Sequence, residues 1–174
     1  MRVLLAALVL FSLFPRALAQ QAQEHEVKAA FLYKFPAFVE WPEGMAGRDP
    51  FIIAVAGATE VAAELGRVAE GREIRGRPVR VRVLAEGEIP AVADLVFIGR
   101  DSPRLAQLAR ALAGTPTLLV SEVPGGLERG AMINFVLTEG RVRFEVAPAT
   151  AERNGLRLSS RLLSVAHSVR SPRL

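Results

Sequence analysis

Three short apolar runs separated by helical segments constrain the fold of this 174-residue chain more than any other feature. Each run has the length and composition of a buried strand. The runs are FIIAVAG (51–57), ADLVFIG (93–99) and TLLVSE (117–122). The segments 59–71 and 103–114 are expected helices, with Thr59 as the N-cap of the first and a cap at Asp101-Ser102 before Pro103 for the second. Strands that alternate with helices predict a parallel sheet.

A strand with a basic face and a hairpin complete the predicted sheet. Valine and arginine alternate in the segment 79–83, which predicts a strand with one apolar face and one basic face. The segment 133–146 has two alternating arms around Glu139 and Gly140, as expected of a β-hairpin. The expected fold class is therefore α/β, with a mostly parallel central sheet, an antiparallel C-terminal hairpin and flanking helices.

An aromatic helix precedes the first apolar run. Apolar residues recur at helical spacing, namely Val27, Phe31, Phe35 and Phe38. Pro36 is expected to kink this helix or to end its first part, because proline lacks a backbone donor. The only tyrosine and the only tryptophan of the chain belong to the same segment. Most of these aromatic side chains are expected to face the core, although such a cluster is also typical of a partner-binding helix.

The C-terminal segment is predicted to be helical over about 148–169, with a break at 154–155 left open. Two adjacent serines, Ser159 and Ser160, raise the question of a nucleophile, since His167 follows them. On a regular helix Ser160 and His167 would lie ~10 Å apart along the axis, beyond hydrogen-bond reach. The chain also contains no G-x-S-x-G motif. We therefore interpret the serines as packing and surface residues.

Residues 1–19 have the pattern of an export signal. Arg2 supplies a positive charge, an apolar stretch follows, and the small residues at 17–19 form a cleavage site. The apolar stretch has about eleven residues, fewer than the ~20 that a membrane span requires. We expect a cleaved signal peptide at 1–19, a mature domain at 20–174 and a periplasmic location; an uncleaved anchor is the alternative.

Charge and motif content argue against several classes of function. The formal net charge of +4 falls to +2 once Arg2 and Arg16 are removed with the signal, and this small surplus does not indicate a nucleic-acid partner. The chain has no cysteine, and its two histidines, His25 and His167, lie near opposite ends of the mature domain. No zinc or phosphate-binding motif is present. The sequence therefore predicts no enzyme, no metal site and no cofactor.

Four stretches of the chain share their order and character with a known family. They are VKAAFLYKFPAFVEWP, GREIRGRPVRVRVL, LVFIG before a helix, and GAMINFVLTEGRVRFEV running into NGLRLSSRLLSVA. Over residues 26–168 the chain resembles the YfiR family of periplasmic regulators. The first and last stretches are the most specific. Better-known members carry cysteines that can form disulfides, and such redox control has no counterpart here.

The resemblance implies a non-catalytic protein that binds the periplasmic sensory portion of an inner-membrane diguanylate cyclase. Such a regulator represses the cyclase, lowers cyclic di-GMP and opposes biofilm growth, and an outer-membrane lipoprotein can sequester it. Another sensor protein could take the place of the cyclase, and the sequence is compatible with a homodimer. We expect the partner-binding surface among Tyr33, Phe38, Trp41, Arg80 and Arg82.

The alternative is a periplasmic small-molecule sensor or solute-binding module. Open α/β sheets bind ligands in the crevice beyond the carboxyl ends of their parallel strands. The expected crevice residues are Gly57, Thr59, Gly99, Ser102, Ser121 and Glu122. The two hypotheses are compatible, because a ligand can gate a regulator.

Overall fold

The computed structural model describes residues 14–44 and 49–170, and its strands form one large sheet and one small sheet. The strands are β1 (Val39–Glu40), β2 (Phe51–Ala56), β3 (Glu73–Ile74), β4 (Arg77–Val83), β5 (Leu95–Ile98), β6 (Leu118–Ser121), β7 (Ile133–Thr138), β8 (Arg141–Val146), β9 (Arg157–Leu158) and β10 (Ser168–Val169). The helices are α2 (Phe14–Lys34), the 3-10 helix η1 (Phe35–Phe38), α3 (Thr59–Ala69), α4 (Leu105–Ala111), α5 (Pro148–Arg153) and α6 (Ser160–Val165).

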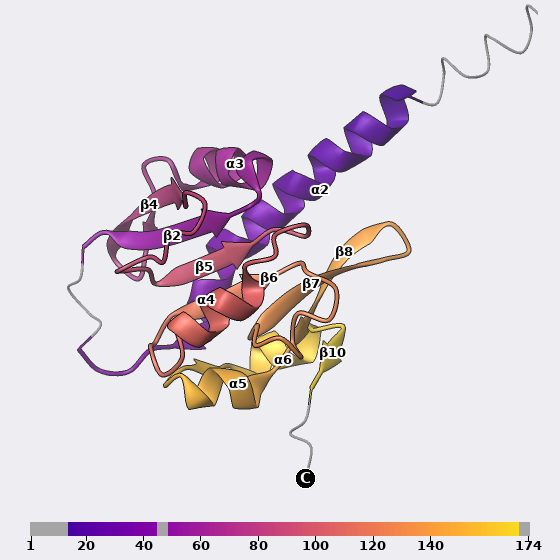
Figure 1. Ribbon diagram of the computed structural model, residues 1–174. Coiled ribbons are helices and arrows are strands. Elements are labelled where there is room, and N and C mark those ends of the chain that lie inside the picture. Colours follow the sequence, from indigo (N-terminus) through magenta and orange to yellow (C-terminus); the bar gives the residue numbers. More distant parts are fainter. Residues whose placement is uncertain (1–13, 45–48, 171–174) are drawn as a thin grey trace, which may run out of the picture.

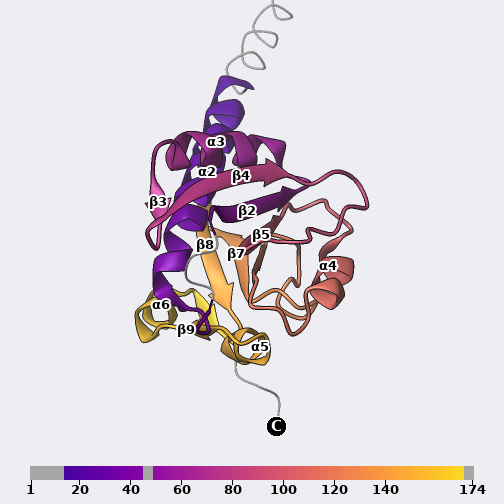
Figure 2. The ribbon, with the colours of Figure 1, turned by 90° about the vertical axis from the view of Figure 1, so that its left-hand side faces the viewer.

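The eight-stranded sheet has the order β10-β8-β7-β6-β5-β2-β4-β3 (Figures 1 and 2). Its central strands β4, β2, β5, β6 and β7 are parallel. Strand β3 pairs antiparallel with β4, and β8 pairs antiparallel with β7 but parallel with β10. Helices α2 and α3 cover one face of the sheet, and α4 covers the other (Figures 1 and 2). This arrangement confirms the predicted fold class.

The strand order reverses between β2 and β5. The chain leaves β2 through α3 and returns as β4 on one side, and it leaves β5 through α4 and returns as β6 on the other side. Because both crossovers start at the carboxyl ends of adjacent strands, their first turns diverge there and leave room above the sheet. The predicted crevice therefore lies at a topological switch point.

The aromatic segment joins the N-terminal helix to the C-terminal hairpin. Helix α2 ends at Lys34, and η1 begins directly before Pro36, as predicted. The Phe35 ring is 1% exposed and lies 5.1 Å from the Phe144 ring and 5.7 Å from the Phe135 ring, centroid to centroid. The Phe31 ring of α2 lies 5.5 Å from the same Phe144 ring, so the rings fix η1 and the end of α2 against β7 and β8.

The hairpin turn also follows the sequence. Thr138 pairs with Arg141, which leaves Glu139 and Gly140 as a two-residue loop. Both loop residues have positive φ values, 51° and 71°, as the commonest hairpin turn requires. The predicted hairpin is confirmed, including its turn.

Both predicted N-caps are wrong. Ala58 occupies the N-cap position of α3, and Thr59 is already the first helical residue, because Gly57 turns the chain one residue earlier with a φ of 66°. Helix α4 starts at Leu105, two residues after the expected Pro103. Ser102 is buried instead, and its hydroxyl accepts a hydrogen bond from the Arg104 amide at 3.4 Å.

The single C-terminal helix is replaced by α5, β9, α6 and β10. The break falls at Asn154 and Gly155, the alternative that the sequence left open. Strand β9 then pairs antiparallel with β1. Ser159 is the N-cap of α6, and its Oγ accepts a hydrogen bond from the Leu162 amide at 3.3 Å. The serine pair therefore begins a helix, with Ser160 as its first residue.

The export-signal prediction concerns residues 1–19, of which 1–13 lie outside the described residues. The backbone of residues 14–19 forms the start of α2. In the described ranges, none of the helices combines the length and the apolar character that a membrane crossing demands.

Candidate functional site

Two cavities flank the turn that follows β2 at the carboxyl edge of the sheet. The first has a volume of about 520 Å³ and is bounded by α2, the start of α3 and the loops after β5 and β6. The second has a volume of about 640 Å³ and is bounded by the loops after β4 and β5 and the start of α3. Gly57 and Asp101 line both cavities. At the switch point, a cavity therefore lies on each side of these two residues.

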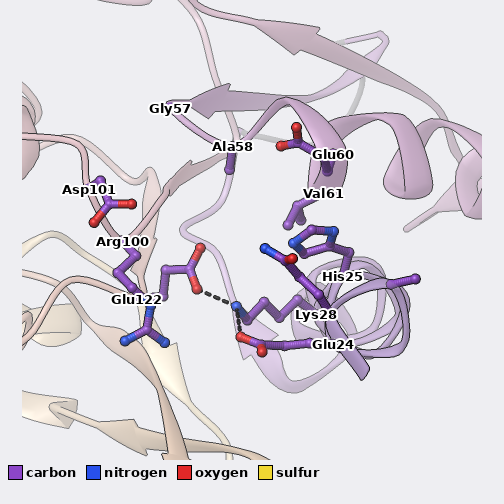
Figure 3. A pocket seen from close by; sticks show the side chains of 12 residues that line it. Glu24, His25, Lys28, Gly57, Ala58, Glu60, Val61, Arg100, Asp101 and Glu122 are labelled. Atoms are coloured by element: carbon purple, nitrogen blue, oxygen red, sulfur yellow. Dashed lines mark hydrogen bonds and ion pairs between the residues drawn. The ribbon is translucent and has the colours of Figure 1, made fainter. Parts of the chain in front are cut away.

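A buried ion cluster forms one wall of the first cavity. Lys28 of α2 extends its ammonium group to the carboxylates of Glu122, at the end of β6, and of Glu24, one helical turn earlier (Figure 3). The side chains of Lys28 and Glu122 are 5% and 7% exposed. The cluster joins α2 to the edge of the sheet across 94 residues of sequence. Glu122 is among the crevice residues predicted from the sequence, whereas Lys28 and Glu24 are not.

The charges around the first cavity have a negative sum. Four carboxylates line it, those of Glu24, Glu60, Asp101 and Glu122, against the two cations Lys28 and Arg100. With His25 neutral, the lining carries a formal charge of −2. Such a wall favours a cationic or zwitterionic small molecule over a phosphate or nucleotide. Among the described residues, the side chains suited to metal ligation form no group of three or more.

Tight backbone packing closes the space between the two cavities. A Cβ atom on Gly99 would overlap the carbonyl oxygen of Gly57 and lie 2.8 Å from its carbonyl carbon. A Cβ atom on Gly57 would lie 2.9 Å from the Cβ atom of Ser102. The turns after β2 and β5 therefore touch each other, and the two glycines permit that contact.

The six expected crevice residues divide into lining and structural groups. Thr59 and Ser102 line the second cavity, Glu122 lines the first, and Gly57 lines both. Gly99 and Ser121 are not among the lining residues of either cavity. Ser121 is fully buried, and its hydroxyl is hydrogen-bonded to the side chain of Asn134 on β7.

A second candidate site combines two aromatic side chains with two arginines. The guanidinium carbon of Arg72 lies 5.7 Å from the centre of the Tyr33 ring, and that of Arg75 lies 5.4 Å from the Trp41 ring. Tyr33 and Trp41 also donate hydrogen bonds to backbone carbonyls, at 3.1 and 3.0 Å. A cation that lies over an aromatic face is attracted to the ring. We call these four residues the aromatic–arginine patch.

The other expected partner-binding residues lie in different environments. Phe38 is half-buried and packs against the core. Arg82 forms an ion pair with Glu88 in the following loop. Arg80 is exposed and has no ion-pair partner among the described residues. The basic face of the segment 79–83 is predicted from the sequence, but the contacts of Arg72 and Arg75 with the aromatic rings are not.

Sequence comparison assigns most of the chain to one family. A family model described as YfiR/HmsC-like matches residues 25–167. This span includes the aromatic–arginine patch and the edge of the sheet that borders both cavities. No curated protein shows significant sequence similarity to the chain.

Proposed function

The chain belongs to the YfiR/HmsC-like family, and from this membership we propose that it represses an inner-membrane diguanylate cyclase by binding its periplasmic sensory portion. The family is one of periplasmic, generally non-catalytic regulators. The observation that carries the proposal is the family match over residues 25–167, which covers nearly all of the predicted mature domain. Repression in this account lowers cyclic di-GMP and opposes biofilm growth.

The proposed mechanism is differential affinity for two states of the partner. A protein that binds the inactive state of a cyclase more tightly than the active state shifts the population toward inactivity without any chemical step. A tenfold preference requires only about 1.4 kcal/mol of differential binding energy. An outer-membrane lipoprotein that competes for the same regulator would relieve repression by lowering its free concentration.

The aromatic–arginine patch is the contact surface that we favour on this domain. Tyrosine, tryptophan and arginine are the side chains that most often dominate protein–protein binding energy. Here Arg72 and Arg75 already lie on Tyr33 and Trp41, so their positions are restrained before a partner binds. Preordered side chains lose less conformational entropy on binding.

We expect charge reversal in the patch to release the partner. Arg75→Glu removes the cation from the Trp41 ring and should weaken partner affinity by about 2 kcal/mol, or roughly 30-fold. Cyclic di-GMP, measured by mass spectrometry in cells that produce each variant, should rise toward the level of cells without the protein. Arg161→Glu makes the same charge change at an exposed position of α6 and serves as the control. Full repression by the Arg75 variant, Trp41→Ala and Arg80→Glu alike would place the contact surface elsewhere.

A small-molecule sensor remains the second candidate, and the first cavity is the observation that favours it. Its formal charge of −2 predicts that compounds with an ammonium group bind there and that nucleotides do not. In a thermal-shift screen of amino acids and nucleotides, a ligand at 100 times its Kd should add ~2.7 kcal/mol of stability. Absence of a shift with every amine tested would count against this candidate.

A further inference from the structure

The outer edge of β4 is open over most of its length. Strand β2 pairs with β4 along one side from Val79 to Val83. On the other side, β3 pairs only with Arg77 and Pro78, and the Arg72 carbonyl accepts one more bond, from the Val79 amide. Figure 2 shows β4 along the near side of the sheet with β3 at one end. From residue 80 onward, no backbone group in the described ranges pairs with this edge.

The backbone groups at this edge have a defined direction. The Leu84 amide donates to Val55 of β2 at 2.8 Å, whereas the Val79 amide points to the opposite side and donates to Arg72. Because successive residues of a strand direct their amide and carbonyl groups to alternate sides, those of Val81 and Val83 point outward. The edge thus presents two donors and two acceptors to an additional strand.

The side chains along the same edge form two rows of different character. The valines lie on the face covered by α3, where Val79 and Val81 are half-buried and Val83 is 50% exposed. The arginines lie on the opposite face, where Arg80 is exposed and the Arg82 side chain is 40% exposed. A strand added at this edge would meet apolar groups on one face and cations on the other.

We propose that the open edge of β4 binds an extended segment of the partner protein as an additional strand. The complementary segment alternates apolar residues, which face Val81 and Val83, with aspartate or glutamate residues, which face Arg80. Main-chain hydrogen bonds to the outward groups supply affinity, and the two side-chain rows supply specificity, as in known cases of strand addition. The inference deepens the proposed function and rests on it for the identity of the partner as a membrane sensor.

The charge of the edge argues against a second copy of this chain as the occupant. Two β4 strands paired edge to edge would bring arginine rows together on the same face of the combined sheet. Like charges on neighbouring strands destabilise the pairing. An acidic strand from a different protein places opposite charges on neighbouring strands and stabilises the pairing. The edge therefore favours the alternating apolar and acidic segment of a partner protein.

Amide hydrogen exchange of the ¹⁵N-labelled domain 20–174 tests this proposal without the natural partner. The probe is a capped hexapeptide of alternating valine and glutamate, and its control is the same peptide with lysine for glutamate. At ten times its Kd, the glutamate peptide should slow exchange of the outward amides of Val81 and Val83 about tenfold. In the variant Arg80→Glu, the lysine peptide should give the protection and the glutamate peptide should not, whereas Arg161→Glu should behave as wild type.

Three results would overturn the inference. They are unchanged exchange at Val81 and Val83 with millimolar glutamate peptide, protection that does not depend on peptide charge, and protection of the same amides by concentration-dependent dimerisation of the chain alone. The peptide experiment uses no natural partner, so a negative result would refute strand addition at β4 but not the proposed repression. The cyclic di-GMP measurement tests repression separately. If repression is lost when the protein is absent but Arg80→Glu represses fully, the proposed function stands and the edge is not the contact.

Discussion

Replacement of Lys28 by methionine is expected to lower the free energy of unfolding by about 3–5 kcal/mol, because it leaves the Glu122 carboxylate buried without its counter-ion. Glu122 is then left near Glu24, a second carboxylate of the same cluster. The Glu122→Leu variant should lose less, since Glu24 still pairs with the ammonium group. Chemical denaturation monitored by circular dichroism measures the free energy of unfolding of the wild type and of both variants.

A double variant separates the ion pair from general packing. Lys28→Met combined with Glu122→Leu removes both buried charges and should recover most of the stability that the single Lys28 change loses. The exposed pair of Arg157 and Glu40 provides the control, because its side chains are 77% and 67% exposed and 3.7 Å apart. Arg157→Met should change stability by less than about 1 kcal/mol. Equal losses for the single and double variants would refute the buried-pair account.

Truncation of Phe35 should lower the free energy of unfolding by a comparable amount, because it removes apolar packing. Phe35→Ala empties the centre of the ring cluster that joins α2 to β7 and β8, and such truncations cost about 3–5 kcal/mol. Phe35→Leu, which retains much of the volume, should lose clearly less. Urea titration with tryptophan fluorescence as the readout compares the two variants.

An exposed apolar residue provides the matched control for Phe35. Val165 on α6 is 67% exposed, so Val165→Ala should lie within about 0.5 kcal/mol of wild type. If Phe35→Ala resembled Val165→Ala, the aromatic cluster would not be part of the stabilising core.

The elements that the sequence predicted correctly are those with a strong local signal. The runs that became β2, β5 and β6 are short and almost wholly apolar, so strand was the only structure that suited their length. The turn formed at Glu139 and Gly140 as expected, because glycine adopts positive φ without strain at the second position. Pro36 ended α2 for a similar reason, since it lacks the amide that a helix requires. Local stereochemistry decided each of these features.

The elements that were missed depend on contacts distant in sequence. The Ser159 amide donates to the carbonyl of Phe38 at 2.9 Å, and β9 pairs with β1, so a tertiary contact draws residues 157–159 out of the predicted helix. In the sequence, nothing distinguishes Lys28 from other polar helix residues. Only the folded chain places Glu122, at the end of β6, beside it. In the same way, Arg75 meets the Trp41 ring only in the folded chain. Periodicity along one segment contains no information about such pairs.

The surfaces of this domain suit different parts of the proposed regulation. The aromatic–arginine patch and the β4 edge offer contacts for a protein partner, and both involve arginines from the segment 72–83. The first cavity lies at the carboxyl ends of the central strands, where a small ligand could alter the packing of α2 through Lys28. A regulator built in this way can bind a membrane sensor through one surface and respond to a ligand through another.

Crosslinking capture in the native envelope tests the central proposal most directly. The chain 20–174 would be tagged at its C-terminus, produced in the periplasm, crosslinked and purified, and its partners would be identified by mass spectrometry. The account predicts recovery of a membrane protein that combines a periplasmic sensory domain with a cytoplasmic diguanylate cyclase domain. Recovery of no membrane signalling protein, in a sample from which a known envelope complex is captured, would contradict it.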